Sequence, residues 1–330
     1  MSLGKRNLQP ILGPTPVDLI REDHPYRRLL AIVPFETLCA GLSSKYSKLG
    51  RAGYPAASLF KALLLQWMED LSDRELERFL QENVAGKFFC DFGLTDKTPD
   101  HTTFWEMRER IGVHGLAQLF NMVRDSLKDA GLVREVFTFV DATHLISKAS
   151  VWKERDRMIA EGESKLNNAN IEKFAVDKDA KFGRKSGTKW YGFKLHAAVD
   201  MSQGLITRIV ATPANIEDEK AAKHVMPRSG MVLADKAYCV GEAKKAMAWR
   251  GLHSGAILRT KMKGKNPEKD RWLSGVRMPF ESTFSKFQKR ARYRGTLKCQ
   301  FQGFMEAFAH NMKRLVSIGA PPLQLRPHCA

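Results

Sequence analysis

The chain has 330 residues, enough for one large or two ordinary domains with a substantial apolar core. Its 54 Lys and Arg outnumber 36 Asp and Glu, and the net charge of +18 indicates a polyanionic partner. No apolar run reaches the roughly 18 residues of a membrane-spanning helix, and no signal peptide is expected. Five scattered cysteines without a C-x-x-C pair argue against a disulfide framework or a zinc site. We therefore expect a nucleic-acid partner, no membrane, and a cytoplasmic, nucleoid-associated location.

Residues 1–132 are predicted to form an all-helical domain. Ala56–Leu71 is apolar over most of its surface, which is typical of a buried helix. Ser72 and Glu75 match a capping box, so the next helix should begin directly after Ser72. Helices are predicted over residues 73–83, from about 100, and over 113–130 before Gly131.

Basic residues decorate this helical region and make it a candidate DNA-binding domain. Ordinary solvated helix faces explain them equally well, and no single helix stands out as a recognition helix. The residues are Arg51, Lys61, Arg74, Arg78, Arg108 and Arg110.

The pattern changes at about residue 133, where strands become frequent. Strands are predicted at 135–141, 190–200, 204–212, 230–235 and 253–259, and helices at 216–226, 240–250, 280–293 and 300–317. Three strands followed by alternating helix and strand is the ribonuclease-H-like order. Residues 133–330 are therefore predicted to form an α/β domain with a mixed five-stranded sheet, flanking helices and a basic insertion at about 145–189. In that order the first and fourth strands are neighbours.

Three acidic residues are the candidate catalytic groups. Asp141 and Asp235 each close a short apolar run, and Glu281 follows Pro279 at an expected helix start. The predicted topology brings all three to one edge of the sheet. Asp200 also ends a strand, but the turn residues that follow it favour a role in a hairpin.

Carboxylates gathered in this way suit hard divalent cations. Two such ions can activate an oxygen nucleophile and neutralise the leaving oxygen of a phosphodiester. Each acid alone is explained as well by a turn or a helix cap, and only the three together predict a site. We expect Asp141, Asp235 and Glu281 to be both catalytic residues and metal ligands, with Mg²⁺ as cofactor and Mn²⁺ able to substitute.

Two basic segments are candidate DNA contacts. Residues 259–298 hold thirteen Lys or Arg against three acids, with aromatic residues interleaved, and we assign phosphate contact to Lys261, Lys263 and Lys265. A solvated basic face is the alternative. The end of the insertion, with Arg184 and Lys185, is predicted to form a basic hairpin that clamps DNA, the alternative being a disordered surface insertion.

Several motifs together resemble a known family. They lie at His24–Arg108, Val140–Thr143, Asp179–Lys185, Tyr191–Asp200, Thr212–Asn215, Ala234–Tyr238 and Ala309–Arg314. With these motifs the chain resembles bacterial insertion-sequence transposases of the DDE type, of the insertion sequence 5 group. The resemblance implies cleavage at transposon ends, attack of the freed 3′-hydroxyl on target DNA, and a homodimer or higher oligomer. The family's two aspartates and its glutamate fall on Asp141, Asp235 and Glu281.

The resemblance has one departure beside Glu281. The related signature has a tyrosine seven residues before the glutamate, an arginine four before and a lysine seven after, where this chain has Ser274, Arg277 and Gln288. Arg277 therefore matches the arginine of the signature and is expected to contact DNA. Lys289 lies one residue after the position of the signature's lysine. On a regular helix Lys289 would turn away from Glu281, and Arg292 would return to its face. We accordingly expect Arg292 to make the phosphate contact beside Glu281, and we count Lys289 as a further candidate DNA contact.

Two other functions remain open on the sequence alone. One is a ribonuclease-H-like nuclease or resolvase without strand transfer, and the other is a DNA-binding protein that keeps the fold without the chemistry. The presence of all three acids favours an enzyme over the second alternative.

Overall fold

The computed structural model describes residues 15–45, 53–149, 156, 159–162, 172–173, 175–185 and 187–325. The described chain forms two compact units, one containing the residues up to Ser126 together with those from Leu315 onward, the other containing Leu127–Arg314. Two helices, α7 (His101–Asp129) and α13 (Thr296–Ser317), contribute residues to both units. None of the helices in this part of the chain is long and apolar enough to cross a membrane.

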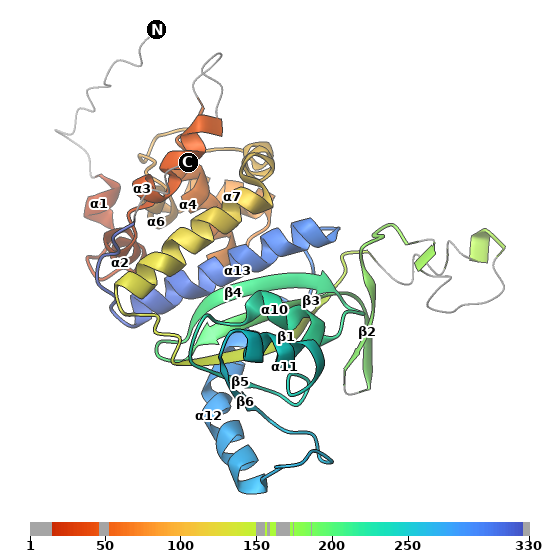
Figure 1. Ribbon diagram of the computed structural model, residues 1–330. Coiled ribbons are helices and arrows are strands. Elements are labelled where there is room, and N and C mark those ends of the chain that lie inside the picture. Colours follow the sequence, from red (N-terminus) through yellow and green to blue (C-terminus); the bar gives the residue numbers. More distant parts are fainter. Residues whose placement is uncertain are drawn as a thin grey trace. The chain divides into compact units, whose positions relative to one another are not determined.

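The first unit is helical, as predicted (Figure 1). Ala57–Met68 is buried throughout, as expected for the apolar helix. The capping box is confirmed, because Ser72 Oγ accepts from the Glu75 N–H at 3.3 Å and Glu75 accepts from the Ser72 N–H at 2.7 Å. The elements are α1 (Pro16–Leu19), α2 (Pro25–Ile32), α3 (Phe35–Cys39), the 3₁₀ helix η1 (Ala40–Lys45), α4 (Ala56–Met68), α5 (Asp73–Glu82), α6 (Val84–Phe89) and α7.

Two basic residues of this unit have structural roles. Lys61 is buried and forms an ion pair with Asp91. The Arg108 guanidinium is also buried and donates to both carboxylate oxygens of Asp73, at 2.7 and 2.6 Å. Because burying a lone charge costs several kcal/mol, these cations belong to the packing of the unit. Neither is available for DNA.

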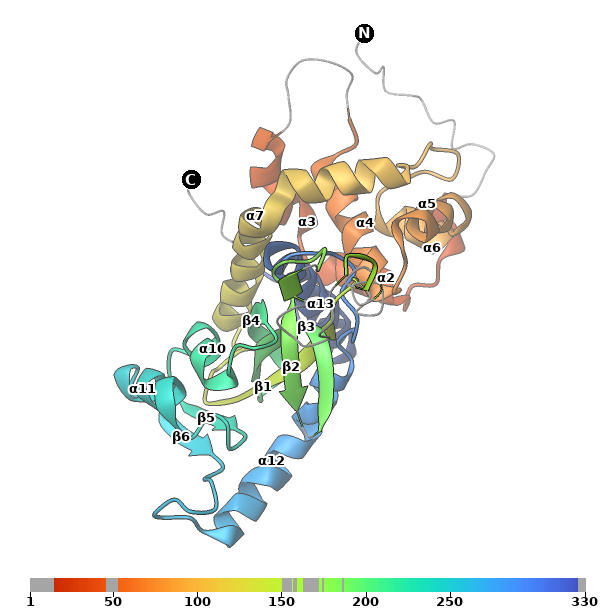
Figure 2. The same ribbon diagram turned by 90° about the vertical axis from the view of Figure 1, so that its right-hand side faces the viewer.

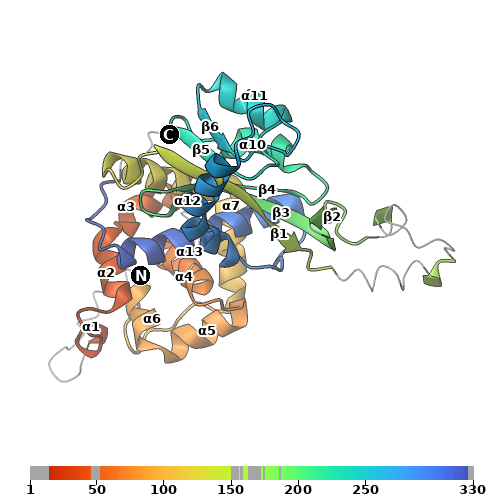
Figure 3. The same ribbon diagram turned by 90° about the horizontal axis from the view of Figure 1, so that it is seen from below.

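The second unit contains a mixed sheet, which confirms the predicted α/β class (Figure 3). Its strands follow the order β2-β3-β1-β5-β6, and β4, which is off this path, pairs antiparallel with β3. β2 adds a sixth strand to the five predicted; it pairs antiparallel with β3 and forms the hairpin at the end of the basic insertion (Figure 2). The strands are β1 (Phe137–Ile146), β2 (Lys181–Lys185), β3 (Thr188–Asp200), β4 (Leu205–Pro213), β5 (Met231–Ala234) and β6 (His253–Ala256).

β1 and β5 are parallel neighbours, as the predicted topology requires. Their pairing ends at Val140 and Ala234, but β1 continues to Ile146 because it keeps its antiparallel partner β3. The expectation that Asp141 ends its strand is therefore wrong. Asp141 lies within β1, at the point where only one of its two neighbouring strands continues.

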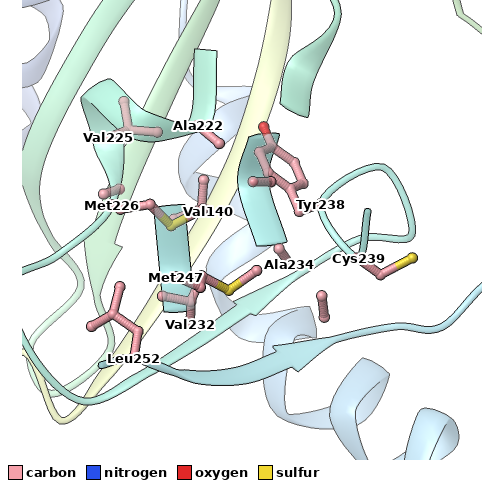
Figure 4. Close-up of a cluster of buried hydrophobic side chains, with 13 residues drawn as sticks. Val140, Ala222, Val225, Met226, Val232, Ala234, Tyr238, Cys239, Met247 and Leu252 are labelled. Carbon is pink, nitrogen blue, oxygen red and sulfur yellow. The ribbon is translucent and has the colours of Figure 1, made fainter. Parts of the chain in front are cut away.

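Helices cover both faces of the sheet. On one face, α10 (Asp218–Val225) and α11 (Gly241–Trp249) pack on the strands, and a cluster of buried side chains joins Val140 and Val232 to Val225 and Met247 (Figure 4). On the other face, Phe139 of β1 packs edge-on against Phe284 of α12 (Pro267–Ser285), with ring centroids 5.3 Å apart. Because side chains alternate along a strand, Asp141 shares the face of Phe139, toward α12.

The helix that carries Glu281 differs from its predicted bounds. It begins at Pro267, where the Asn266 side chain accepts from the backbone N–H groups of Glu268 and Lys269, and it ends at Ser285. Pro279 lies inside this helix instead of at its start. Beyond it, the chain pairs with the end of β1: the Ile146 N–H donates to Lys289 O, and the Ala291 N–H donates to Ile146 O, both at 2.8 Å. These tertiary hydrogen bonds replace the helix predicted to run to 293.

Candidate active site

Two aspartates lie side by side at the end of a pair of parallel strands. Val140 of β1 and Ala234 of β5 form the last pair of that ladder, and an aspartate follows each of them. Adjacent strands are about 4.8 Å apart, so Asp141 and Asp235 are neighbours across the sheet. Both side chains are partly exposed. The two aspartates therefore lie at the same edge of the sheet, where both are open to a ligand.

Short local hydrogen bonds orient the two carboxylates. Asp141 Oδ1 accepts from the Ala142 N–H at 2.7 Å. Asp235 Oδ1 accepts from the Ala237 N–H at 2.8 Å, and the Tyr238 N–H donates to Asp235 O at 3.2 Å, so Asp235 opens a tight turn. Within the described residues Asp235 forms no ion pair, which leaves its charge available.

Glu281 and Arg277 lie one turn apart on α12. The Glu281 side chain is 52% exposed and its Oε1 is 3.4 Å from a guanidinium nitrogen of Arg277. Arg277 is 12% exposed, and its guanidinium lies over the ring of Phe139, 5.7 Å from the centroid. Phe139 precedes Asp141 by two residues on the same face of β1. The pair is therefore anchored to the strand and the face that carry Asp141.

The donor atoms suit a divalent cation, although the acids are not gathered into a complete metal site. Asp141, Asp235 and Glu281 offer carboxylate oxygens, the ligands that Mg²⁺ and Mn²⁺ prefer. In the part of the chain that the structure describes, no three His, Cys, Asp or Glu side chains are close enough together to hold an ion. The structure thus brings Asp141 and Asp235 together, but Glu281 does not complete a cluster with them.

Lys289 lies beside the site, contrary to the expectation that it turns away. Its Nζ donates to Thr143 Oγ1 at 2.9 Å, and Thr143 follows Asp141 by two residues on the same face of β1. The expectation was wrong because the helix ends before Lys289. The sequence signal for this early end was the pair Ser282 and Ser285, since serine hydroxyls compete for backbone carbonyls. They donate to Pro279 O and Ser282 O, at 3.0 and 2.8 Å.

Arg292 does not lie on the helix face of Glu281. It follows the end of α12 in the connection to α13, where its N–H donates to Gln302 Oε1 at 2.8 Å and its Nε donates to Gln288 Oε1 at 3.0 Å. The angular argument that favoured Arg292 requires a continuous helix, so it no longer applies.

The other predicted DNA contacts differ in how their side chains are held. Lys261 and Lys263 are exposed in the segment before α12. Lys265 is tethered, because its Nζ donates to Leu258 O and Asp270 Oδ2, both at 2.7 Å. Arg184 is exposed on β2, and the side chain of Lys185 on the same strand lies outside the described residues.

The Asp200 carboxylate is buried and accepts hydrogen bonds from the backbone, which gives it a structural role. It is 1% exposed, and its Oδ2 accepts from the backbone N–H groups of Glu135 and Arg134 at 2.6 and 3.1 Å. Its Oδ1 accepts from the Ser202 N–H at 2.9 Å. A carboxylate that closes a turn and ties it to the start of β1 has little capacity left for a metal ion.

A mixed sheet with two acids that follow the last pair of a parallel ladder, within a basic chain, defines the class of ribonuclease-H-like enzymes that act on polynucleotides. Two family models match the chain: "Transposase domain (DUF772)" over residues 15–110 and "Transposase DDE domain" over residues 134–312, more than half of its length. The chain therefore belongs to the insertion-sequence DDE transposases, enzymes that bind DNA and depend on divalent metal ions. No solved structure matches it.

Proposed function

We propose that this transposase cuts DNA at the ends of its insertion sequence and joins the freed 3′-hydroxyl to target DNA. The observation that carries the proposal is the register of Val140 with Ala234, which sets Asp141 beside Asp235. We further assign the chain to the insertion sequence 5 group, on the motifs quoted above.

We propose Asp141, Asp235 and Glu281 as the metal ligands and Mg²⁺ as the metal, with Mn²⁺ as a substitute. When bound, the ions activate the attacking oxygen and neutralise charge on the leaving oxygen. Asp141 and Asp235 are held by the strands and by local hydrogen bonds. Glu281 is exposed near the end of α12 and pairs with Arg277 at 3.4 Å, so it would hold an ion together with the aspartates only after its side chain turned toward them.

Two cations near the acids are suited to hold the DNA backbone. Lys289 is fixed by its hydrogen bond to Thr143, and Arg277 by its stacking on Phe139. Both can place positive charge beside Asp141 and thereby orient the phosphate that is cut. Lys261, Lys263 and Arg184 extend the basic surface, and we propose that these three residues and Lys185 contact phosphates further along the duplex.

The domain roles, the assembly and the location are also proposals. Residues 1–132 act as a DNA-binding domain and residues 133–330 as the catalytic domain. Two transposon ends must be joined in concert, which calls for a homodimer or a higher oligomer. DNA as substrate and the free thiols of the four cysteines in the described residues favour the bacterial cytosol, in contact with the nucleoid.

The test uses labelled duplexes that carry the inverted repeats found beside the coding segment, incubated with the full-length protein, target plasmid and Mg²⁺. The proposal requires Mg²⁺-dependent cleavage at the repeat and covalent joining of the labelled 3′ end to the plasmid. Cleavage without joined product would identify a nuclease instead. Binding without cleavage in either Mg²⁺ or Mn²⁺ would identify a DNA-binding protein that has kept only the fold.

A further inference from the structure

The segment that carries Lys289 is hydrogen-bonded on both of its sides. On the side of β1, Lys289 O accepts from the Ile146 N–H and the Ala291 N–H donates to Ile146 O, both at 2.8 Å. These two bonds form a parallel bridge between Arg290 and Ile146. In an extended chain the N–H and C=O groups of alternate residues point to opposite sides. The residues that alternate with Lys289 and Ala291 therefore direct their backbone groups away from β1.

Two side chains of α13 take up the hydrogen bonds on that other side. Glu306 Oε2 accepts from the Gln288 N–H at 3.1 Å, and Gln302 Oε1 accepts from the Arg292 N–H at 2.8 Å. Gln302 Nε2 donates to Arg290 O at 3.2 Å and to Glu306 Oε1 at 2.8 Å. Gln302 and Glu306 lie one turn apart on α13 and are 0% and 7% exposed. This pair, which we call the α13 clamp, binds the segment as a neighbouring strand would.

The α13 clamp fixes the backbone from which the Lys289 side chain projects. Lys289 is exposed, and its Nζ reaches Thr143 Oγ1 at 2.9 Å. A lysine carries its charge on a flexible four-carbon stem, so the place of that charge depends on where the backbone is held. The bridge to β1 joins one residue on each side, and the α13 clamp supplies the hydrogen bonds on the other side. Holding the segment between β1 and α13 keeps Lys289 beside Thr143.

We propose that Gln302 and Glu306 are positioning residues for DNA cleavage, which act through Lys289. They hold residues 288–292 against β1, so that the ammonium group of Lys289 meets the reacting phosphate next to Asp141. Both side chains are buried, so they do not contact DNA themselves. Small displacements of a group that orients the substrate are costly to the rate. The inference rests on the proposed function, because it requires that Lys289 bind the phosphate.

The decisive variant is Gln302→Met, which keeps the length of the side chain and removes its hydrogen bonds. Gln300→Met is the matched control, because Gln300 makes the same kind of paired bonds from the same helix to β4. Its Oε1 accepts from the Ala211 N–H at 2.7 Å, and its Nε2 donates to Ile209 O at 3.1 Å. Each change is made in the full-length wild type and in Lys289→Ala. The initial rate of cleavage of a labelled end in Mg²⁺ is measured at a temperature where every protein is folded, together with each unfolding temperature.

We expect Gln302→Met to slow cleavage about tenfold in the wild type. In the Lys289→Ala background the same change should alter the rate by at most about twofold, because a residue that acts through the lysine has no further effect once the lysine is absent. Gln300→Met should also lower the unfolding temperature, but it should change the rate by at most about twofold in either background.

Glu306→Gln is the second variant, and it decides the matter if Gln302→Met does not fold. The Glu306 carboxyl group accepts with both oxygens. A glutamine offers one acceptor oxygen, so either the Gln288 N–H or the Gln302 amide loses its acceptor. Cleavage should slow in the wild type and change little in Lys289→Ala.

Two results would overturn the inference and leave the proposed function intact. One is a wild-type rate in Gln302→Met when Lys289→Ala is slow. The other is an equal loss from Gln302→Met in both backgrounds, which would give the α13 clamp a purely structural role. A wild-type rate in Lys289→Ala would overturn the phosphate contact of Lys289 and this inference together, and a wild type that did not cut DNA would overturn the proposed function as well.

Discussion

The ammonium group of Lys289 donates a hydrogen bond to Thr143 Oγ1 at 2.9 Å, which fixes a positive charge two residues along β1 from Asp141. The link depends on the early end of α12 at Ser285 and on the bridge that then joins the chain to Ile146. In sequence, Lys289 lies one residue after the position at which the related signature has its lysine.

Lys289→Ala should therefore impair end cleavage more than Arg292→Ala. A charged hydrogen bond to a phosphate contributes about 1.5–3 kcal/mol, so the expected loss for Lys289→Ala is about tenfold or more. The check is the initial rate of cleavage of a labelled end by the two purified variants. Equal rates, or a slower Arg292→Ala enzyme, would show that Lys289 does not hold the reacting phosphate.

Asp141→Asn, Asp235→Asn and Glu281→Gln should each reduce cleavage to background and retain DNA binding. Each change keeps the shape of the side chain and removes the charge that holds a metal ion. Cleavage and gel-shift assays on folded protein measure the two properties separately. Normal turnover in any one variant would remove that residue from the site.

Asp200→Asn should act on stability instead of chemistry. The Asp200 carboxylate accepts from three backbone N–H groups. An amide in that place turns one acceptor into a donor, and we expect a loss of about 1–3 kcal/mol in the free energy of unfolding. Denaturant titration measures that loss, and cleavage at a temperature where the variant is folded should be near normal. Complete inactivity in a stably folded Asp200→Asn would contradict this assignment.

Lys261→Gln with Lys263→Gln should weaken binding to DNA of any sequence. The slope of log affinity against log salt concentration should flatten by about 0.9 for each phosphate that the protein no longer neutralises. Lys265→Gln is the matched control, since the tether to Leu258 and Asp270 predicts a smaller change. Fluorescence anisotropy at several salt concentrations gives the slopes. An unchanged slope in the double variant would identify a solvated surface.

Glu135 should make the second unit sensitive to acid. It is 3% exposed and pairs with Lys128 at 2.8 Å and Arg208 at 2.5 Å. Burial acts to raise the pKa of Glu135, but the two cations outweigh it and the pKa falls below its ordinary value of 4.5. Its contribution is thus fully present above pH 4.5 and is lost as the pH falls through the lowered pKa.

Glu135→Gln should lower the free energy of unfolding at neutral pH by about 3–5 kcal/mol, because it removes the buried carboxylate that pairs with both Lys128 and Arg208. It should also flatten the fall in stability below pH 4.5. Urea unfolding across the acid and neutral range checks both. If the free energy of unfolding of the variant fell below pH 4.5 as steeply as that of the wild type, other carboxylates would be responsible for the acid sensitivity.

The sequence by itself determined the elements whose signals are local. The apolar run of α4 predicted a buried helix, and Ser72 with Glu75 predicted where α5 begins. The apolar runs before Asp141 and Asp235, together with the strand order, predicted that these two acids would be neighbours. Such features depend on residues within a few positions of one another or on a topology with few alternatives.

Only the tertiary structure decided where β1 and α12 end. β1 runs past Asp141 because β3, which lies far along the chain, supplies hydrogen-bond partners as far as Ile146. α12 stops at Ser285 because the following residues pair with that same end of β1, which also places Lys289 beside Thr143. Buried backbone groups must find partners, and local propensity cannot show which distant segment will provide them.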